Sequence, residues 1–175
     1  MRILQVTSAY ARNQSLMQLI DTMPWSFDNG GVLLWNGRNK IKSFCLSTEG
    51  NSVEVVVKRF KHLSLIQKVV YAIRKHKARK AYYNALELVR RGVRTPAPVA
   101  FIEQRNGLWL TDAYYISEAT SLRSIESEVD RDDWNRKLAT AFGQFVATLH
   151  SKGVLHHDLN DTNVLYDTDS AGNYR

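Results

Sequence analysis

Residues 153–167, GVLHHDLNDTNVLYD, hold the densest cluster of polar side chains in the chain, set between short apolar runs. The flanking runs, Val154-Leu155 and Val164-Leu165, predict two short strands that hold a loop between them. Within that loop Asp158 stands five positions before Asn163. A carboxylate held in this way can orient or deprotonate a substrate hydroxyl, and an amide oxygen can bind a divalent cation. The stretch therefore predicts a loop that performs chemistry.

Two other interpretations of the same residues are open. His156, His157 and Asp158 would form a metal site, although adjacent histidines on a strand point to opposite faces. Alternatively, the stretch is a polar turn in which Asp161 and Asn163 cap a loop.

The composition is that of a soluble globular protein, with 44% hydrophobic and 23% charged residues among 175. The single cysteine, Cys45, excludes a disulfide framework and fits a reducing compartment, which predicts a cytoplasmic location. Residues 1–14 lack the apolar core of a signal peptide, and no stretch approaches the roughly 20 apolar residues of a membrane span. We therefore expect any contact with a membrane to be peripheral.

The rest of the chain alternates between strand and helix patterns. Apolar spacing predicts a helix over residues 14–23 that stops at Pro24. Residues 31–60 predict a three-stranded antiparallel meander, with turns at Asn-Gly and Glu-Gly-Asn, whose last strand ends at Lys58. The remaining predicted elements are a helix over 63–91 ended by Gly92, strands over 99–104 and 107–117 joined at Asn106-Gly107, and a helix over 134–150 ended by Gly153. A seam is predicted near residues 117–121.

Positive charge is concentrated between Lys58 and Arg94, where twelve Lys and Arg residues accompany one acid, Glu87. The net charge of the chain is +7. Such a stretch favours an anionic partner: a nucleotide, a phosphorylated glycan, acidic headgroups or nucleic acid. Nucleic acid is disfavoured because the stretch lacks interleaved aromatic residues and any recognisable reader motif. A solvated basic helix face without a specific partner is the alternative.

Two stretches resemble the protein-kinase-like fold. HHDLNDTN, residues 156–163, is similar to its catalytic loop, and EVVVKRF, residues 54–60, is similar to the strand that carries its nucleotide lysine. A finer resemblance covers residues 15–175 and is to the lipopolysaccharide kinase family, the small Kdo/heptose kinases, especially compact members in Bacteroidetes. The segments similar to that family are NGRNKIKSF, VVVKRFK, KARKAYYNALELVRRGVRTPAPVAFIE, TDAYYIS and GVLHHDLNDTNVLYD.

The resemblance implies an α+β, protein-kinase-like architecture, with an antiparallel-sheet N-lobe over residues 1–117 and a partial helical C-lobe over 118–175. It implies that Lys58 anchors the phosphates of ATP, with Gly37 and Arg38 in a short loop that covers them. The helix glutamate that usually pairs with this lysine is replaced by Tyr83, and Glu87 is the candidate substitute one turn later.

In the catalytic loop the resemblance implies that Asp158 is the catalytic carboxylate and Asn163 a ligand of Mg²⁺. Asn160 occupies the position where protein kinases tend to have a phosphate-directed lysine. The segment with the metal-binding aspartate is expected to lie beyond this sequence, because Asp167 and Asp169 fit the turn DTDSAGN better. The chain is therefore expected to be a fragment or a shortened member.

The implied activity is an ATP- and Mg²⁺-dependent transfer of phosphate to a sugar hydroxyl of the lipopolysaccharide inner core, on Kdo-lipid A or heptose. We expect a monomer that acts on the cytoplasmic face of the inner membrane, in peripheral contact with it, and that binds no nucleic acid. A catalytically inactive kinase-like binding module, or an inactive fragment of a longer kinase, is the alternative. A protein or small-metabolite acceptor also remains open, because fold does not fix substrate.

Overall fold

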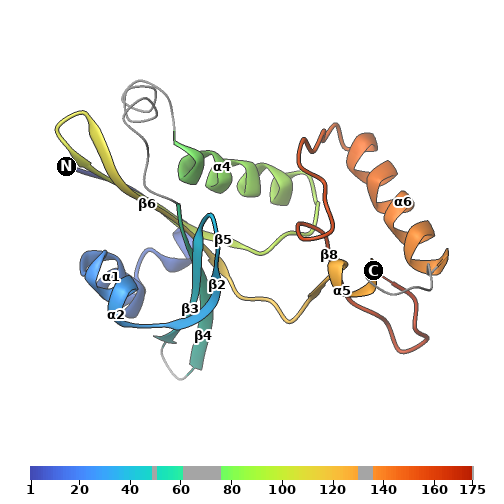
Figure 1. Ribbon diagram of the computed structural model, residues 1–175, viewed down its shortest axis with the longest axis horizontal. Helices are drawn as coiled ribbons and strands as arrows, with labels where there is room; N and C mark the ends of the chain where they lie inside the picture. The colour runs from blue at the N-terminus through green and yellow to red at the C-terminus, as the bar shows by residue number, and fades with distance from the viewer. Residues whose placement is uncertain (49–50, 61–75, 130–135, 175) are drawn as a thin grey trace. The chain divides into compact units, whose positions relative to one another are not determined.

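The computed structural model describes residues 1–48, 51–60, 76–129 and 136–174 of the chain. The chain divides into two compact units, residues 1–119 and residues 120–175, whose helices and strands are drawn in Figure 1. Each unit has an apolar core of its own.

One six-stranded antiparallel sheet organises the first unit. Its strands are β1 (Arg2–Val6), β2 (Val32–Asn36), β3 (Lys40–Thr48), β4 (Asn51–Arg59), β5 (Pro98–Asn106) and β6 (Trp109–Glu118). Their order across the sheet is β1-β5-β6-β4-β3-β2, so β4 is internal and β2 lies at an edge. The predicted meander is β2-β3-β4, and the predicted hairpin joins β5 to β6. The mixed α+β class is therefore confirmed.

Two helices, α1 (Gln14–Asp21) and α2 (Trp25–Asn29), pack against one face of this sheet. Helix α1 begins where the Asn13 side chain accepts a hydrogen bond from the backbone N–H of Leu16 at 2.8 Å, the usual role of an N-cap residue. Each fully buried aliphatic side chain in such a core contributes about 1.5–3 kcal/mol to stability. The buried core residues are Leu16, Leu19, Ile20, Met23, Phe27, Leu46, Val55, Val57, Val99, Ala100, Ile102, Tyr114 and Ile116.

A longer helix, α4 (Lys77–Arg90), packs against β5 and β6 (Figure 1). Phe101 of β5 faces this helix, and its ring centre lies 5.4 Å from that of Tyr82. The helix ends at Gly92, which has a φ of 66°, a conformation that glycine adopts without strain. The N–H of Gly92 donates to Val89 O and that of Val93 to Leu88 O, both at 2.9 Å, which is a Schellman motif. The predicted helix end is therefore confirmed.

The first unit also contains elements that the sequence did not predict. Strand β1 pairs with β5, the 3₁₀ turn Ser8–Tyr10 follows it, and α2 is a separate short helix. The predicted continuous helix over residues 63–91 is wrong at His76, whose backbone is extended (φ −69°, ψ 162°) and which caps α4 at Lys77. The part of that prediction before His76 cannot be compared, because residues 61–75 lie outside the described residues. They include the predicted helical stripe of Leu63, Ile66, Val69, Val70 and Ile73.

The second unit contains α5 (Glu126–Val129), α6 (Arg136–Ser151) and a two-stranded sheet of β7 (Arg123–Ser124) and β8 (Leu165–Tyr166). Its core consists of Ile125, Leu138, Val164 and Tyr166, with Phe142, Phe145, Leu159 and Tyr174 packed against them. Helix α6 confirms the predicted helix from residue 136 onward. It ends in a second Schellman motif at Gly153, whose φ is 67°.

The predicted strand at Val154-Leu155 is wrong. The backbone N–H of Val154 donates to Leu149 O at 2.9 Å and so completes the end of α6 instead of a strand ladder. Leu155 is 69% exposed and is not part of the core. Of the two pairs that flank the predicted catalytic loop, the second, Val164-Leu165, reaches a sheet through Leu165 of β8.

A buried ionic cluster lies at the start of α4. His76 is 2% exposed, and its Nδ1 accepts a hydrogen bond from the Ala78 N–H at 3.2 Å. Glu103, which is fully buried, pairs with Arg79 at 3.2 Å and with Arg105 at 3.0 Å. Burial lowers the pKa of His76 to about 4, the nearby Glu103 carboxylate opposing this and the charges of Lys77 and Arg105 adding to it. His76 is therefore neutral in the folded protein at pH 7.

This lowered pKa predicts acid sensitivity of the first unit. Between about pH 6.5, the ordinary pKa of histidine in an unfolded chain, and about pH 4, only the unfolded state binds the proton. The free energy of unfolding should therefore fall as the pH is lowered through this window. In urea titrations at pH 7 and pH 5, His76→Asn, which retains an N-cap side chain, should reduce the fall. His150→Asn, at an exposed histidine of α6, is the control, and equal falls in both variants would contradict the prediction.

Candidate functional site

Lys58 lies near the end of β4, in the interior of the sheet. Successive side chains of a strand point to opposite faces. Val57 packs in the core under α1 and α2, so Lys58 points to the other face. Its side chain is half-buried, and its Nζ lies 5.6 Å from the centre of the Phe60 ring.

The strand register places Lys58 in a row of side chains that runs across five strands. Directly opposite residues of antiparallel strands share a face. The pairings Trp35–Ile41, Ile41–Lys58, Lys58–Tyr115 and Tyr115–Phe101 therefore put all five side chains on one face. Lys58 is the only charged residue of the row.

The two ends of this row differ in exposure. At one end Phe101 packs on Tyr82 of α4, and burial together with the nearby Tyr82 raises the pKa of Tyr115 to about 12. At the other end Trp35 is 62% exposed and Ile41 is half-buried. Lys58 thus stands between the part of the face that α4 covers and an apolar part open to solvent.

A second row lies beside the first, toward the end of β6. Its members are paired as Val32–Ser43, Ser43–Val56 and Val56–Ser117. The row consists of two valines and two serines, all small side chains, and Val32 at the edge is 66% exposed. On the opposite face the Tyr10 hydroxyl donates to the Glu118 carboxylate at 2.7 Å, which fixes the end of β6. A flat ligand group would fit against such small side chains.

The loop between β2 and β3 contains Gly37 and Arg38, both exposed. The N–H of Gly37 donates to Asn39 O at 3.2 Å. A Cβ atom on residue 37 would meet the Trp35 indole nitrogen at 2.5 Å, so the ring lies against the glycine. A larger residue at position 37 would require the indole to shift.

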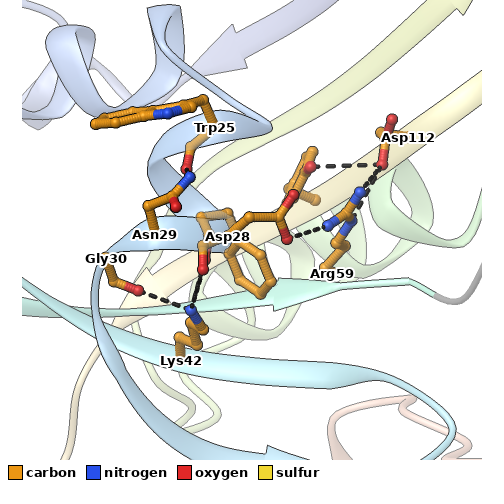
Figure 2. Close-up of polar contacts among 9 residues, drawn as sticks. Trp25, Asp28, Asn29, Gly30, Lys42, Arg59 and Asp112 are labelled. Atoms are coloured by element: carbon orange, nitrogen blue, oxygen red, sulfur yellow. Dashed lines mark hydrogen bonds and ion pairs between the residues drawn. The ribbon is translucent and has the colours of Figure 1, made fainter.

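The opposite face of β4 is braced by Arg59 (Figure 2). Its guanidinium bonds the Asp112 carboxylate of β6 at 2.6 and 3.0 Å and pairs with Asp28 of α2 at 2.7 Å. It also lies over the rings of Phe27 and Tyr114, 5.7 and 5.6 Å from their centres. Arg59 therefore ties β4 to its neighbouring strand and to α2 at the position next to Lys58.

A second buried cation, Lys42, supports the same region (Figure 2). Its Nζ donates to the backbone oxygens of Phe27 at 2.7 Å, Gly30 at 2.8 Å and Asp28 at 3.3 Å. These carbonyls belong to the C-terminal end of α2, where a cation is favoured by the helix dipole. The sequence does not mark out either residue, because Arg59 is one of many cations between Lys58 and Arg94 and Lys42 is a single lysine of an alternating strand.

Glu87 lies on the exposed side of α4, with Tyr83 one turn before it. Its carboxylate accepts hydrogen bonds from Arg90 at 2.6 Å and from Arg91 at 2.7 Å. These bonds lower the pKa of Glu87 to about 2, and the bond from Arg90 has the larger effect. Tyr83 contacts Tyr82 and Phe101, with ring centres 5.4 and 6.0 Å away. The suggested pairing of Glu87 with Lys58 stays a prediction, and the contacts described for Glu87 are to arginines.

In the second unit the predicted catalytic residues lie together. Asn163 Nδ2 donates to the Asp158 carbonyl at 2.9 Å and to its carboxylate at 3.2 Å. Asn160 Nδ2 donates to the other carboxylate oxygen of Asp158 at 3.2 Å. The Asn160 amide oxygen accepts the backbone N–H of Asn163 at 3.1 Å. The three side chains thus fix one another, and all are exposed to solvent.

This arrangement leaves particular oxygen atoms available. Because Asn163 uses its amide nitrogen toward Asp158, its amide oxygen points elsewhere and accepts no hydrogen bond from the described residues. A carboxylate and an amide oxygen are the donor types that Mg²⁺ prefers. By contrast, the Asp169 carboxylate accepts bonds from Ala171 and Asn173 of its own turn, as the sequence indicated.

The loop is anchored by residues that sequence analysis did not single out. Leu159, between Asp158 and Asn160, packs against the core of Ile125, Leu138, Val164 and Tyr166. The Ser124 hydroxyl donates to Asp161 O at 2.7 Å. Leu159 is a single apolar residue within a polar run, and this was the sequence feature from which the anchoring of the loop could have been predicted. Its burial makes the neighbouring polar side chains project outward.

Two negative observations apply to the described ranges. Over residues 1–48, 51–60, 76–129 and 136–174, no group of three or more His, Cys, Asp or Glu side chains is placed to hold a metal ion. Within the same ranges, no helix is long and apolar enough to cross a membrane.

A model of the lipopolysaccharide kinase (Kdo/WaaP) family matches residues 46–175. The chain belongs to this family. No curated protein matches the chain. Membership implies the protein-kinase-like fold, a phosphotransferase family and the use of ATP.

The Kdo/WaaP match includes most of the predicted site residues but not all of them. Lys58, Glu87 and the catalytic loop lie within residues 46–175, whereas Gly37 and Arg38 precede the matched region. The assignment of the loop between β2 and β3 to phosphates therefore lies outside the match and stays a prediction from the resemblance.

The contacts of Arg59 predict that its side chain contributes measurably to the stability of the strand that carries Lys58. Arg59→Met would leave Asp112, whose side chain is 12% exposed, without its cationic partner. We expect the free energy of unfolding in urea to fall by about 2 kcal/mol, the usual range for hydrogen bonds to charged groups. Arg2→Met is the matched control, because Arg2 pairs with an Asp21 side chain that is 66% exposed, and such pairs contribute about 0–1 kcal/mol. Equal effects of the two substitutions would contradict this assignment.

Proposed function

We propose that this member of the Kdo/WaaP family transfers the γ-phosphate of ATP to a sugar hydroxyl, on Kdo or heptose, of the lipopolysaccharide inner core. The observation that carries the proposal is the hydrogen-bonded set of Asp158, Asn160 and Asn163, a carboxylate held by two amides on an anchored loop. Residues 1–119 are assigned to the nucleotide-binding lobe and residues 120–175 to the catalytic lobe.

In the nucleotide lobe Lys58 would bind the α and β phosphates, since a fixed ammonium stabilises negative charge that builds up during transfer. The row of small side chains Val32, Ser43 and Val56 supports a place for the base beside it. Backbone N–H groups around Gly37 and the guanidinium of Arg38 would contact the phosphates from the loop.

In the catalytic lobe Asp158 would accept the proton of the acceptor hydroxyl as its oxygen attacks the γ-phosphorus. The O–H bond of the sugar breaks, a new P–O bond forms, and ADP leaves with the bridging oxygen. Asn160 and Asn163 would hold the carboxylate in place through their amide N–H groups. Asn160 is also the candidate contact to the transferred phosphate.

The residues present fit a magnesium ion. The Asn163 amide oxygen would be one of its ligands, and the bound ion would neutralise charge on the phosphates. This oxygen lies on a loop fixed by Leu159 and Val164. The remaining ligands would come from phosphate oxygens and water.

The acceptor class follows from the family and is favoured by charge. Lys77, Lys80 and Arg94 are exposed on or just after α4, and Kdo and phosphorylated lipid A are anionic. Peripheral contact with the inner membrane and a monomeric state stay predictions.

A second candidate is a kinase-like module that binds nucleotide or anionic partners without catalysis. It is favoured by Tyr83, which stands where the resemblance expects the glutamate partner of Lys58. It is also favoured by Glu87, the candidate substitute partner of Lys58, because the Glu87 carboxylate is bonded to two arginines.

The transfer reaction separates these candidates. The full chain is incubated with γ-labelled ATP, Mg²⁺ and Kdo-lipid A, and label in the lipid is measured. Asp158→Asn should lower the transfer rate by about 10²–10⁴-fold, the usual contribution of a general base. Asp161→Asn is the matched control, because its side chain accepts only a local backbone bond from Thr162. Transfer by Asp158→Asn at the wild-type rate would contradict the proposal, and ATP binding without any transfer would favour the binding module.

A further inference from the structure

Trp35 is a large apolar side chain that the core does not use. It is 62% exposed on the edge strand β2, and an indole left in water gives up stabilisation that burial would provide. The register shifts between Leu33 and Trp35, as at a β-bulge, which re-aims the side chains that follow it. Trp35 is thereby paired with Ile41 and placed on the face of Lys58.

The distance between these two residues suits one ligand. Trp35 and Lys58 are separated by a single strand, β3, through Ile41. Two strand spacings amount to about 10 Å, which the ribose and triphosphate of one nucleotide can bridge. The bulged pairing therefore brings an exposed aromatic ring and an ammonium group to the two ends of one open surface.

The indole also lies against the loop between β2 and β3. It occupies the space in which a side chain on residue 37 would stand, with its nitrogen 2.5 Å from the ideal Cβ position of Gly37. The ring and the loop backbone are therefore in contact. A ligand bound against this loop would bury the ring at the same time.

We infer that Trp35 contacts bound nucleotide, with its indole packed against the ribose and phosphates of an ATP molecule whose phosphates meet Lys58. This inference deepens the proposed function and rests on it. Trp35 forms the outer edge of the site. At the opposite edge, Tyr115 of β6 and Phe101 of β5 lie next to α4. The contact of Trp35 with Gly37 couples the outer edge to the phosphate loop.

Among the described residues, the two other exposed tryptophans do not share this position. Trp25 is 68% exposed but belongs to α2 (Figure 2), which packs on the face of Val57 and Arg59. Trp109 is 49% exposed and begins β6 next to the Asn106-Gly107 turn, opposite Asn106. Leu33, also exposed, is paired with Lys42 and so lies on the α2 face. Trp25 is therefore the matched control.

The test combines fluorescence with calorimetry on the full chain. ATP with Mg²⁺ should change the tryptophan emission of the wild type and of Trp25→Phe, and should leave that of Trp35→Phe unchanged. In calorimetry, Trp35→Ala should weaken ATP binding by about tenfold, the effect of losing a partly buried aromatic contact. Trp25→Ala should bind ATP with the wild-type affinity. Circular dichroism and the urea midpoint verify that each variant is folded.

The possible outcomes distinguish a failure of this inference from a failure of the proposed function. Wild-type affinity in Trp35→Ala, or an emission change that keeps its wild-type size in Trp35→Phe, would overturn the role of Trp35 and leave the nucleotide site intact. Absence of ATP binding in the wild type would overturn the inference together with the nucleotide site. If Trp35→Ala proves unfolded, Trp35→Phe and Trp35→Leu supply the comparison, and an unchanged affinity in the folded Leu variant would likewise overturn it.

Discussion

The alternation of side chains along β4 is the constraint on which the rest of the first unit depends. Three consecutive residues, Val57, Lys58 and Arg59, point to alternate faces of an internal strand. Val57 and Arg59 anchor the strand, one in the apolar core and the other through Asp112 and Asp28. Lys58 therefore projects from the other face, and its position is fixed by the contacts of its two neighbours. A shift of register by one residue would exchange the two faces.

The second unit solves a similar problem with a loop. A polar loop is usually mobile because few of its groups are buried, yet here Leu159 and Val164 pack in the core of α6 and β8. The amides of Asn160 and Asn163 then hold the Asp158 carboxylate between them. Anchoring by apolar side chains and orientation by amides are separate tasks, and different residues of the loop perform them.

Sequence predicted the features that depend on local pattern. The meander, the hairpin at Asn106-Gly107 and the two helix ends at Gly92 and Gly153 follow from turn chemistry and were confirmed. Features that depend on distant partners were missed. Strand β1 is specified by its pairing with β5, and the side to which Trp35 points is set by an irregularity in the β2-β3 ladder. Val154 was expected to enter a strand, but its N–H completes the end of α6. The roles of the site residues remain predictions, because they require a substrate.

The most direct measurement is calorimetric titration of the full chain with ATP in the presence and absence of Mg²⁺. Lys58→Met and Lys80→Met are compared, since each removes one ammonium group, the first on the open sheet face and the second on the exposed side of α4. The account predicts magnesium-dependent binding that Lys58→Met abolishes or weakens at least tenfold and that Lys80→Met retains. Equal affinity in the two variants would contradict the claim that the Lys58 face is the nucleotide site.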